Sequence, residues 1–226
     1  MFWFAKIIAK IILWFVGVSL VLALLFKFAP PPLTATMAFN SGGITKDWKN
    51  LSDIDPNMVS AVIAAEDSKF CSHNGFDQTA IKNAFKRNLQ AKANGGRIRG
   101  GSTISQQTAK NVFLWQGGGY FRKGLEAWFT FLIERIWGKR RIMEVYLNVA
   151  ETGIGTYGAE AGAQRYFGHS AARLNVAEAA RMAAALPLPQ KRAVTNPTGA
   201  TRRYGQIIAA RMGVVQRDGL NACVYE

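Results

Sequence analysis

The chain has 226 residues, of which 49% are hydrophobic and only 19% are charged. The hydrophobic content excludes an intrinsically disordered chain, and two cysteines are too few for a small disulfide-rich scaffold. The formal net charge of +14 indicates an anionic partner, either nucleic acid or the phosphates of a membrane, and the charge alone does not choose between them.

The N-terminal segment predicts a membrane-spanning helix. Residues 11–26 carry no charge, and at about 1.5 Å per residue they cover roughly 24 Å as a helix. Lys10 and Lys27 can extend their amines toward the lipid headgroups, so that residues 7–28 act as the span. The positive charges before the segment place the N-terminus in the cytoplasm and the rest of the chain outside. A cleaved signal peptide, for which no clear A-x-A site follows, and a core helix are the alternatives.

A proline-rich stretch follows the apolar segment. Residues 29–43 contain three prolines and small polar residues, a composition that predicts a spacer, first stiff and then flexible. We therefore divide the chain into an anchor at 1–28, a periplasmic tether at 29–44 and one domain at 45–226, which has an ordinary domain length.

Helical signals dominate this domain, and alternating strand patterns are nearly absent. The predicted helix starts are Asp55–Pro56, Thr79, Ser102 and Asn175, the last with Glu178 at capping-box spacing. Three further helices are predicted at 122–137, 139–150 and 206–212. The fold class is therefore mainly α.

Glu66 stands out within the first helix of this domain. It falls on the apolar stripe of that helix, four residues after Val62 and three after Ile63. Burial raises the pKa of a carboxyl group, as a general base or acid near neutral pH requires. A polar helix end that frays into a loop is the alternative.

The sequence GGSTISQQ precedes and opens another helix. Glycines that lead into a helix start leave N–H groups free for a phosphate. Thr103, Gln107 and Lys110 share one polar face at i, i+4 and i+7, and Arg97 and Arg99 come just before. This surface suits a diphosphate, whereas an ordinary capped helix is the alternative; a P-loop is excluded because Gly-Lys-Ser/Thr is missing.

Three further segments gather charges or aromatic rings. Arg122, Lys123 and Glu126 lie within two helical turns, where an i,i+3 ion pair between Lys123 and Glu126 is the simplest interpretation. The basic run at 139–141 is either a solvated face or a site for lipid phosphates. Aromatic residues flank the glycines at 117–119, which indicates either a mobile loop whose rings enter the membrane interface or a buried loop between helices.

Metal and redox chemistry have weak sequence signals. His73 and His169 are the only histidines and stand in no ligand spacing, so no zinc site is predicted. Cys71 and Cys223 lie in the outer domain, and both a disulfide and two isolated buried thiols remain open.

Taken in order, these motifs resemble the peptidoglycan glycosyltransferases of carbohydrate family fifty-one. Residues 66–77 resemble E-D-x-x-F-x-x-H-x-G-x-D, 100–107 resemble G-G-S-T-I-x-Q-Q, 122–126 match R-K-x-x-E, and 142–148 and 158–167 resemble the fourth and fifth family motifs. The resemblance covers about residues 45–215. It departs from the family pattern at residues 117–119 and at Arg181, where the family is usually apolar.

The resemblance implies a lysozyme-like α-helical domain with a smaller membrane-facing subdomain. It implies polymerisation of lipid II into glycan strands, with inversion and with undecaprenyl diphosphate as the leaving group. Glu66 matches the family's general base and Glu126 its second catalytic glutamate, which would orient the diphosphate side. Substrate-binding roles carry over to Asp67, Phe70, His73, Thr103, Gln107, Lys110, Arg122, Lys123 and Asn148.

The resemblance also implies a setting in the cell. The partners would be lipid II, the nascent glycan strand, membrane lipids and proteins of cell-wall synthesis and division, without nucleic acid. The location would be the inner membrane, single-pass, with a cytoplasmic N-terminus and a periplasmic catalytic domain. A divalent cation, Mg²⁺ or Mn²⁺, near Glu126 stays open.

The chain resembles the monofunctional kind of this family, because only about ten residues follow the last motif-like helix. The alternative functions are a lysozyme-like enzyme that cleaves glycan and a non-catalytic, membrane-tethered domain that binds anionic lipid.

Overall fold

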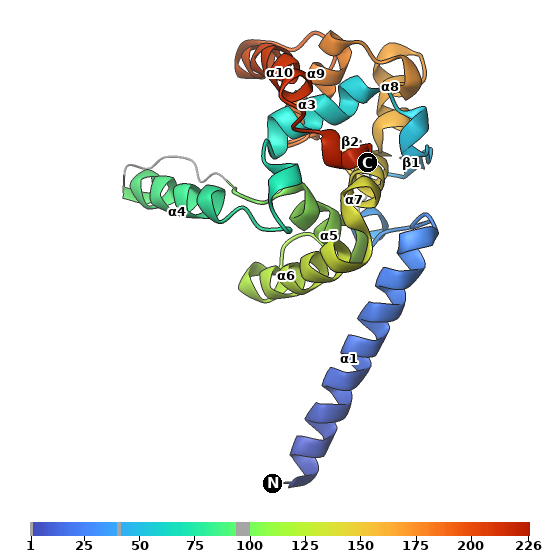
Figure 1. The fold of residues 1–226 in the computed structure, drawn as a ribbon, viewed down its shortest axis with the longest axis vertical. Helices are drawn as coiled ribbons and strands as arrows, with labels where there is room; N and C mark the ends of the chain where they lie inside the picture. Colours follow the sequence, from blue (N-terminus) through green and yellow to red (C-terminus); the bar gives the residue numbers. More distant parts are fainter. Residues whose placement is uncertain (1, 40–41, 94–99) are drawn as a thin grey trace.

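The computed structural model describes residues 2–39, 42–93 and 100–226 of the chain. As Figure 1 shows, a long N-terminal helix, α1 (Phe2–Phe28), extends away from a body that is built mainly of helices. The helices of the body are α2 (Ala35–Ala38), α3 (Pro56–Glu66), α4 (Gln78–Ala93), α5 (Ile104–Phe113), α6 (Gly119–Ile136), α7 (Gly138–Val149), α8 (Ala159–Phe167), α9 (Val176–Ala185) and α10 (Gly199–Arg217). Four short 3-10 turns are η1 (Leu51–Asp53), η2 (Phe70–Ser72), η3 (Ala171–Arg173) and η4 (Ala222–Val224). The predicted mainly α fold is confirmed.

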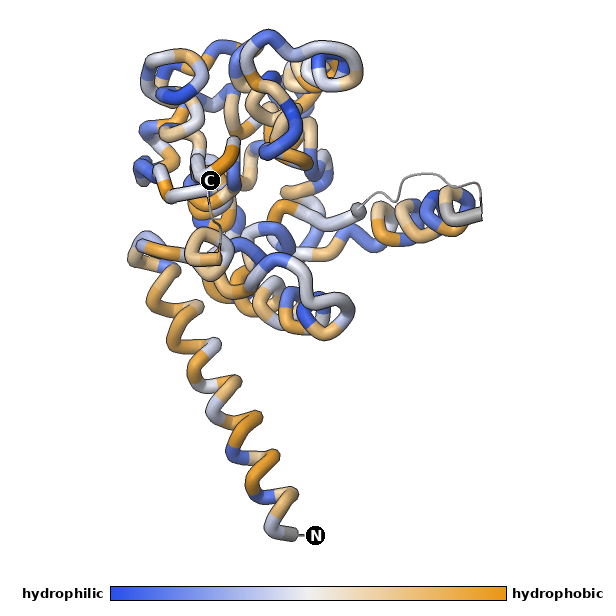
Figure 2. Tube along the Cα trace, turned by 180° about the vertical axis from the view of Figure 1, so that it is seen from behind, coloured by the Kyte–Doolittle hydropathy of each residue, from blue (hydrophilic) through white to orange (hydrophobic). Residues whose placement is uncertain are grey.

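Helix α1 is apolar along most of its length, as Figure 2 shows. Its segment Trp3–Phe28 is long and apolar enough to cross a membrane, so the predicted N-terminal apolar helix is confirmed. The C-terminal half of α1 is fastened to the body. Trp128 of α6 donates its indole N–H to Ser19 Oγ at 3.0 Å, and Arg141 of α7 donates to the carbonyl oxygen of Phe26 at 3.0 Å. The arginine thus satisfies a carbonyl at the helix end, where no intrahelical partner exists.

Two predicted helix starts are confirmed and two are corrected. Asp55 caps α3 by accepting from the Asn57 N–H at 2.8 Å, and Asn175 forms the predicted capping box of α9. Helix α4 begins one residue before Thr79, and Asp77 accepts from a backbone N–H of its first turn.

Helix α5 is capped by Thr103 rather than by Ser102. Thr103 Oγ1 accepts from the Gln106 N–H, and Gln106 Oε1 accepts in return from the Thr103 N–H, which completes a capping box. Ser102 Oγ accepts instead from Lys123 Nζ at 3.0 Å. Gln106, three residues after Thr103, was the sequence signal for this cap, because a capping box needs Glu or Gln at that position.

The remaining predicted helices are found with shifted bounds, and a small sheet was missed. The helix predicted at 206–212 is the much longer α10. Three strands form the sheet in the order β1-β3-β2: β1 (Thr45–Lys46), β2 (Glu151–Gly153) and β3 (Thr156–Tyr157), with β1 parallel and β2 antiparallel to β3. Strands of two or three residues are too short for an alternating pattern.

Part of the predicted tether is packed rather than flexible. Thr34 caps the short helix α2, and Met37 is fully buried in the core. Thr36 donates its hydroxyl to the Leu114 carbonyl at the end of α5. The prediction of a flexible spacer is therefore wrong for residues 34–38, because α2 packs against α5 and buries Met37.

Two aromatic or apolar surfaces face away from the core. Helix α4 projects from the body in Figure 1, and the face of α4 that carries Ile81, Phe85 and Leu89 is exposed. Tyr120 and Phe121, at the start of α6, are 97% and 73% exposed. The start of α6 therefore presents these two rings outward, which excludes the buried-loop alternative for their side chains.

The core positions the end of α3 between two groups of helices. Helix α3 packs against α9 and α10, whereas α5 packs against α6 and α7. Figure 1 shows the first group at the end of the body far from α1 and the second group beside α1. The last residue of α3 meets α5 where the two groups join.

Candidate active site

Glu66 is the last residue of α3 and contacts the polar face of α5. Gln107 donates its side-chain N–H to Glu66 Oε2 at 2.7 Å. The buried Tyr146 of α7 donates its hydroxyl to Gln107 Oε1 at 3.4 Å. The tyrosine therefore fixes the amide with its NH₂ group toward the carboxylate, so three elements orient Glu66.

Burial raises the pKa of the Glu66 carboxyl group. The hydrogen bond from Gln107 and the positive charges of Arg192 and Lys110 oppose this effect, while the neighbouring Asp67 adds to it. The raised pKa agrees with the expectation from the position of Glu66 on the apolar stripe. Such a carboxylate is a stronger proton acceptor than an exposed one.

Lys110 lies on the same face of α5, about one turn beyond Gln107. Burial lowers its pKa, and the negative charges of Glu126 and Glu66 both raise it. The ammonium group is thus within electrostatic reach of both predicted catalytic carboxylates. Because a partly desolvated ammonium is strongly attracted to anions, Lys110 suits the stabilisation of phosphate charge.

Glu126 of α6 is only 2% exposed and is held between two cations. Arg122 Nη1 donates to Glu126 Oε2 at 2.7 Å, and Lys123 Nζ donates to Glu126 Oε1. The predicted i,i+3 ion pair is found, and an i,i+4 pair accompanies it. With Lys110 nearby, three cations surround one carboxylate, and this cluster carries an excess of positive charge.

This donor set does not fit a divalent cation held by protein side chains. Both oxygens of Glu126 already accept from cationic groups, and a further cation there would be repelled by them. Among the described residues, no group of three or more His, Cys, Asp or Glu side chains could hold a metal ion.

A cavity of about 950 Å³ opens beside these groups, near the upper end of the range for ligand sites. Gln107, Lys110 and Tyr146 form one wall, and the segment Leu186–Lys191 after α9 forms another. Gln190 of that segment donates to Glu151 of β2 across the rim at 3.1 Å. Gln107, which orients Glu66, and Lys110, on which the charges of both glutamates act, therefore face the same cavity.

Asp67, Phe70 and His73 have internal partners rather than a place on this wall. His73 Nε2 donates to Asp67 Oδ1 at 2.9 Å, because its Nδ1 already accepts from the Gly75 N–H. Asp67 Oδ2 also accepts from the Ile104 N–H at the start of α5, at 3.0 Å. Phe70 is fully buried. These contacts position the start of α5, and the predicted substrate-binding roles of the three residues stay predictions.

Thr103 and Asn148 are also used internally. Thr103 Oγ1 donates to the Gly75 carbonyl at 2.6 Å and is the N-cap of α5. Asn148 accepts from the N–H and donates to the C=O of Lys49, each at 2.8 Å, which fastens the segment after β1 to α7. Both are almost fully buried and connect parts of the framework, and their predicted substrate-binding roles stay predictions. Arg97 and Arg99 lie outside the described residues.

Two neighbours of Glu66 have no signal in the sequence. Tyr204 of α10 donates its hydroxyl to the Ala65 carbonyl at 2.8 Å, directly before Glu66. Arg192 donates to the Ala184 carbonyl at 2.6 Å and lies over the Tyr204 ring. No local motif marks either residue, and only the packing of α3 against α9 and α10 brings them to the site.

Comparisons with known proteins agree with this arrangement. Residues 35–213 match the family model described as Transglycosylase. The chain is 50% identical over 222 residues to a protein of Caulobacter vibrioides, covering 97% of this chain and 95% of the relative. It is 47% identical to a protein of Rhodospirillum centenum (91% of this chain, 89% of the relative) and 44% identical to one of Pseudomonas aeruginosa (90% of each). All three relatives are named biosynthetic peptidoglycan transglycosylase.

Proposed function

The chain belongs to the transglycosylase family and is a peptidoglycan glycosyltransferase, and we propose from this premise that it polymerises lipid II into glycan strands. Undecaprenyl diphosphate is the leaving group, and Glu66 is the general base. The observation that carries the proposal is the pairing of one oriented, partly desolvated carboxylate with a separate cationic cluster on α5 and α6.

The chemistry follows from these two groups. Glu66 takes the proton from the 4-hydroxyl of the acceptor sugar, whose oxygen attacks C1 of the donor sugar. The bond between C1 and the diphosphate oxygen breaks, and its electron pair leaves with the diphosphate. Lys110, Arg122 and Lys123 stabilise the charge that develops there. One displacement inverts the configuration at C1, and Gln107 keeps the carboxylate aimed at the acceptor.

Glycan cleavage is the nearest rival and fits the site less well. A hydrolase needs two carboxyl groups in acid and base or nucleophile roles. Both oxygens of Glu126 are already engaged by Arg122 and Lys123, so this carboxylate has a different use from the second carboxyl group of a hydrolase. Glycan cleavage releases no phosphate, so it gives no reason for the cluster of Lys110, Arg122 and Lys123.

The proposed setting is the inner membrane, with α1 as a single span, its N-terminus in the cytoplasm and the body in the periplasm. Lys6 and Lys10, which precede the uncharged segment at 11–26, support this orientation. The Cys71–Cys223 disulfide fits an oxidising compartment. The exposed apolar faces of α4 and of the start of α6 suit contact with the outer leaflet. Cell-wall synthesis and division proteins are the proposed protein partners.

The test uses the purified full chain in lipid vesicles. Supplied with lipid II alone, it should form glycan polymer and release undecaprenyl diphosphate; supplied with preformed glycan alone, it should leave the length of the strands unchanged. Shortening of preformed glycan without polymer formation would establish the hydrolase instead. Binding of anionic vesicles without either reaction would establish the non-catalytic alternative.

A further inference from the structure

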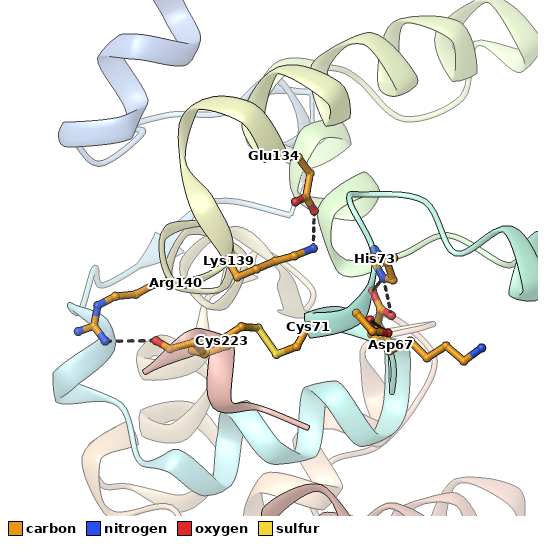
Figure 3. The surroundings of a disulfide bond; sticks show 10 residues. Asp67, Cys71, His73, Glu134, Lys139, Arg140 and Cys223 are labelled. Carbon is orange, nitrogen blue, oxygen red and sulfur yellow. Dashed lines mark hydrogen bonds and ion pairs between the residues drawn. A yellow bond between two sulfur atoms is a disulfide. The ribbon is translucent and has the colours of Figure 1, made fainter. Parts of the chain in front are cut away.

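A disulfide joins the C-terminal end of the chain to the turn that follows the general base. Cys71 lies in η2 and Cys223 in η4, and the two are 152 residues apart in sequence. Figure 3 shows the bond lying between the two turns, with the Asp67–His73 pair beside it. Neither cysteine stands at a position that the family motifs specify. The roles proposed for Glu66 and for the cationic cluster therefore do not account for the bond.

The turn that carries Cys71 controls the start of α5. Asp67 and His73 flank η2 and are hydrogen-bonded to each other. Asp67 also accepts from the Ile104 N–H, and the Gly75 carbonyl accepts from Thr103. A displacement of this turn therefore displaces the first turn of α5, and with it the side chains that α5 presents to Glu66.

The turn is held from two sides. On one side, Lys139 Nζ lies 4.6 Å from the centre of the Phe70 ring and pairs with Glu134 at 2.7 Å, as Figure 3 shows for the ion pair. On the other side stands the disulfide. The lysine contact is non-covalent and its ring partner is neutral, so the covalent link is the stronger of the two restraints.

The other end of the disulfide is itself anchored. Val224, next to Cys223, is fully buried, and its carbonyl accepts from Arg140 of α7 at 3.2 Å. Asn221 donates its side-chain amide to Ser60 of α3 at 3.4 Å. Residues 221–224, called the C-terminal strap from here on, therefore link α3 and α7 to the turn between α3 and α4.

We propose that the Cys71–Cys223 disulfide is a positioning element of the active site, which holds the turn after Glu66 so that α3 and α5 keep Glu66 and Gln107 in register. This proposal rests on the proposed function, because its readout is glycan polymerisation. It assigns the C-terminal strap a role in catalysis rather than in stability alone.

The consequence is a loss of turnover when the bond is opened. An ångström-scale displacement of a catalytic group costs up to about 10²-fold in rate, so we expect kcat to fall about tenfold or more. The KM for lipid II should change little, because the three cations do not lie in the first turn of α5. Lys110 is in the last turn of α5, and Arg122 and Lys123 are in α6.

The pH profile gives a readout that a purely structural bond would not move. Loosening the turn admits water to Glu66, so its pKa falls toward the ordinary value and the acid limb of kcat/KM moves to lower pH. Asp67, Lys110 and Arg192 are the charged groups that act on Glu66. Tyr146 and Tyr204 also face it and remain neutral, because burial raises the pKa of both.

The experiment compares three forms of the full chain in lipid vesicles with lipid II. These are the oxidised wild type, the wild type reduced with dithiothreitol, and the double variant Cys71→Ser/Cys223→Ser. Dithiothreitol gives two electrons and two protons to the disulfide and becomes a cyclic disulfide, leaving two protein thiols that are counted with a thiol reagent. Helix content is followed by circular dichroism at the assay temperature, and removal of the reductant with re-oxidation should restore turnover.

Leu174→Ala is the matched control. Leu174 is almost fully buried and lies before α9. Its carbonyl accepts from Asn57 at the start of α3, the opposite end of that helix from Glu66 and the turn, so its truncation lowers stability without removing a contact of the strap. We expect Leu174→Ala to keep wild-type kcat and acid limb while its melting temperature falls.

Each outcome decides the proposal. Lower kcat and a shifted acid limb, in protein that keeps its helix content, support it. Unchanged kcat and pH profile after reduction overturn it, as does an equal loss of kcat in Leu174→Ala. Loss of helix content at the assay temperature also overturns it, because the bond then serves the fold as a whole. If the oxidised wild type forms no polymer, the proposed function fails instead, and that result is distinct from all of these.

Discussion

Gln107 donates to Glu66 across the junction between α5 and α3, at 2.7 Å. The donor group is fixed because the other end of the amide accepts from Tyr146. A carboxylate that is desolvated by burial and steadied by one neutral hydrogen bond keeps a raised pKa, yet stays aimed in one direction. The site thereby combines basicity with orientation, and the pH dependence of the enzyme should depend on this pair.

Removal of the amide should shift the pH profile. The hydrogen bond from Gln107 lowers the pKa of Glu66 against the effect of burial, so Gln107→Ala should raise that pKa further. Because the base acts as the carboxylate, the acid limb of kcat/KM should move to higher pH. Gln164→Ala, which removes an exposed glutamine on α8, is the control. An acid limb that stays in place or moves to lower pH in Gln107→Ala contradicts the proposed role.

Glu66→Gln should stabilise the protein at neutral pH. The pKa of Glu66 is raised above its ordinary value of 4.5 in the folded state, so its ionisation favours the unfolded chain. That cost is absent below pH 4.5 and grows as the pH rises through the folded-state pKa. The melting temperature of Glu66→Gln should therefore exceed that of the wild type increasingly from acidic to neutral pH. An equal or smaller melting temperature at neutral pH would count against a buried, ionised Glu66.

The capping of α5 gives a paired prediction. Thr103→Ala removes a side chain that is both the N-cap and a donor to Gly75, and should lower the free energy of unfolding by about 1–2 kcal/mol. Ser102→Ala should cost less than about 0.5 kcal/mol, since Ser102 only accepts from a half-exposed lysine. Urea denaturation of both variants decides the matter. A larger loss for Ser102→Ala would return the cap to that residue.

The exposed rings predict a contact with lipid. Phe85 of α4 is 64% exposed, and Phe121 of α6 is more exposed still. In a chain that lacks residues 1–28, the double change Phe85→Ser/Phe121→Ser should reduce flotation with anionic vesicles. Each substitution removes an aromatic ring that would bury apolar surface in the lipid. Val176→Ser removes an exposed apolar residue from α9 and should leave flotation unchanged. Equal flotation of the double variant and its parent would rule these rings out as a membrane contact.

The helices were largely predictable because their signals are local. Caps such as Asp55 and Asn175 lie within three residues of the helices they start. The small sheet and the packing of Met37 depend on segments that are distant in sequence, and no local pattern reports them. The cysteine pairing stayed open for the same reason, since two cysteines state only that one bond is feasible.

In the candidate site too, residues with a local sequence signal were predicted, and residues brought in by distant packing were not. Glu66 was found because a carboxylate on an apolar stripe is a local anomaly, and Gln107 and Lys110 because they share a helical face. Arg192 and Tyr204 were missed because they reach Glu66 only through helix packing. At motif positions such as Asp67 and Asn148 the structure shows internal hydrogen bonds that the sequence did not predict, because a motif does not distinguish a contact residue from one that holds the contact residue in place.

The assignment of Glu66 as the general base is tested by the polymerisation of lipid II by Glu66→Gln, measured beside the wild type and Glu178→Gln. Glu178 is also a helix-associated carboxylate, but it serves the capping box of α9. We expect polymer from the wild type and from Glu178→Gln, and a loss of at least about 10²–10⁴-fold in Glu66→Gln, which keeps its helix content. Turnover by Glu66→Gln at the wild-type rate would contradict Glu66 as the general base.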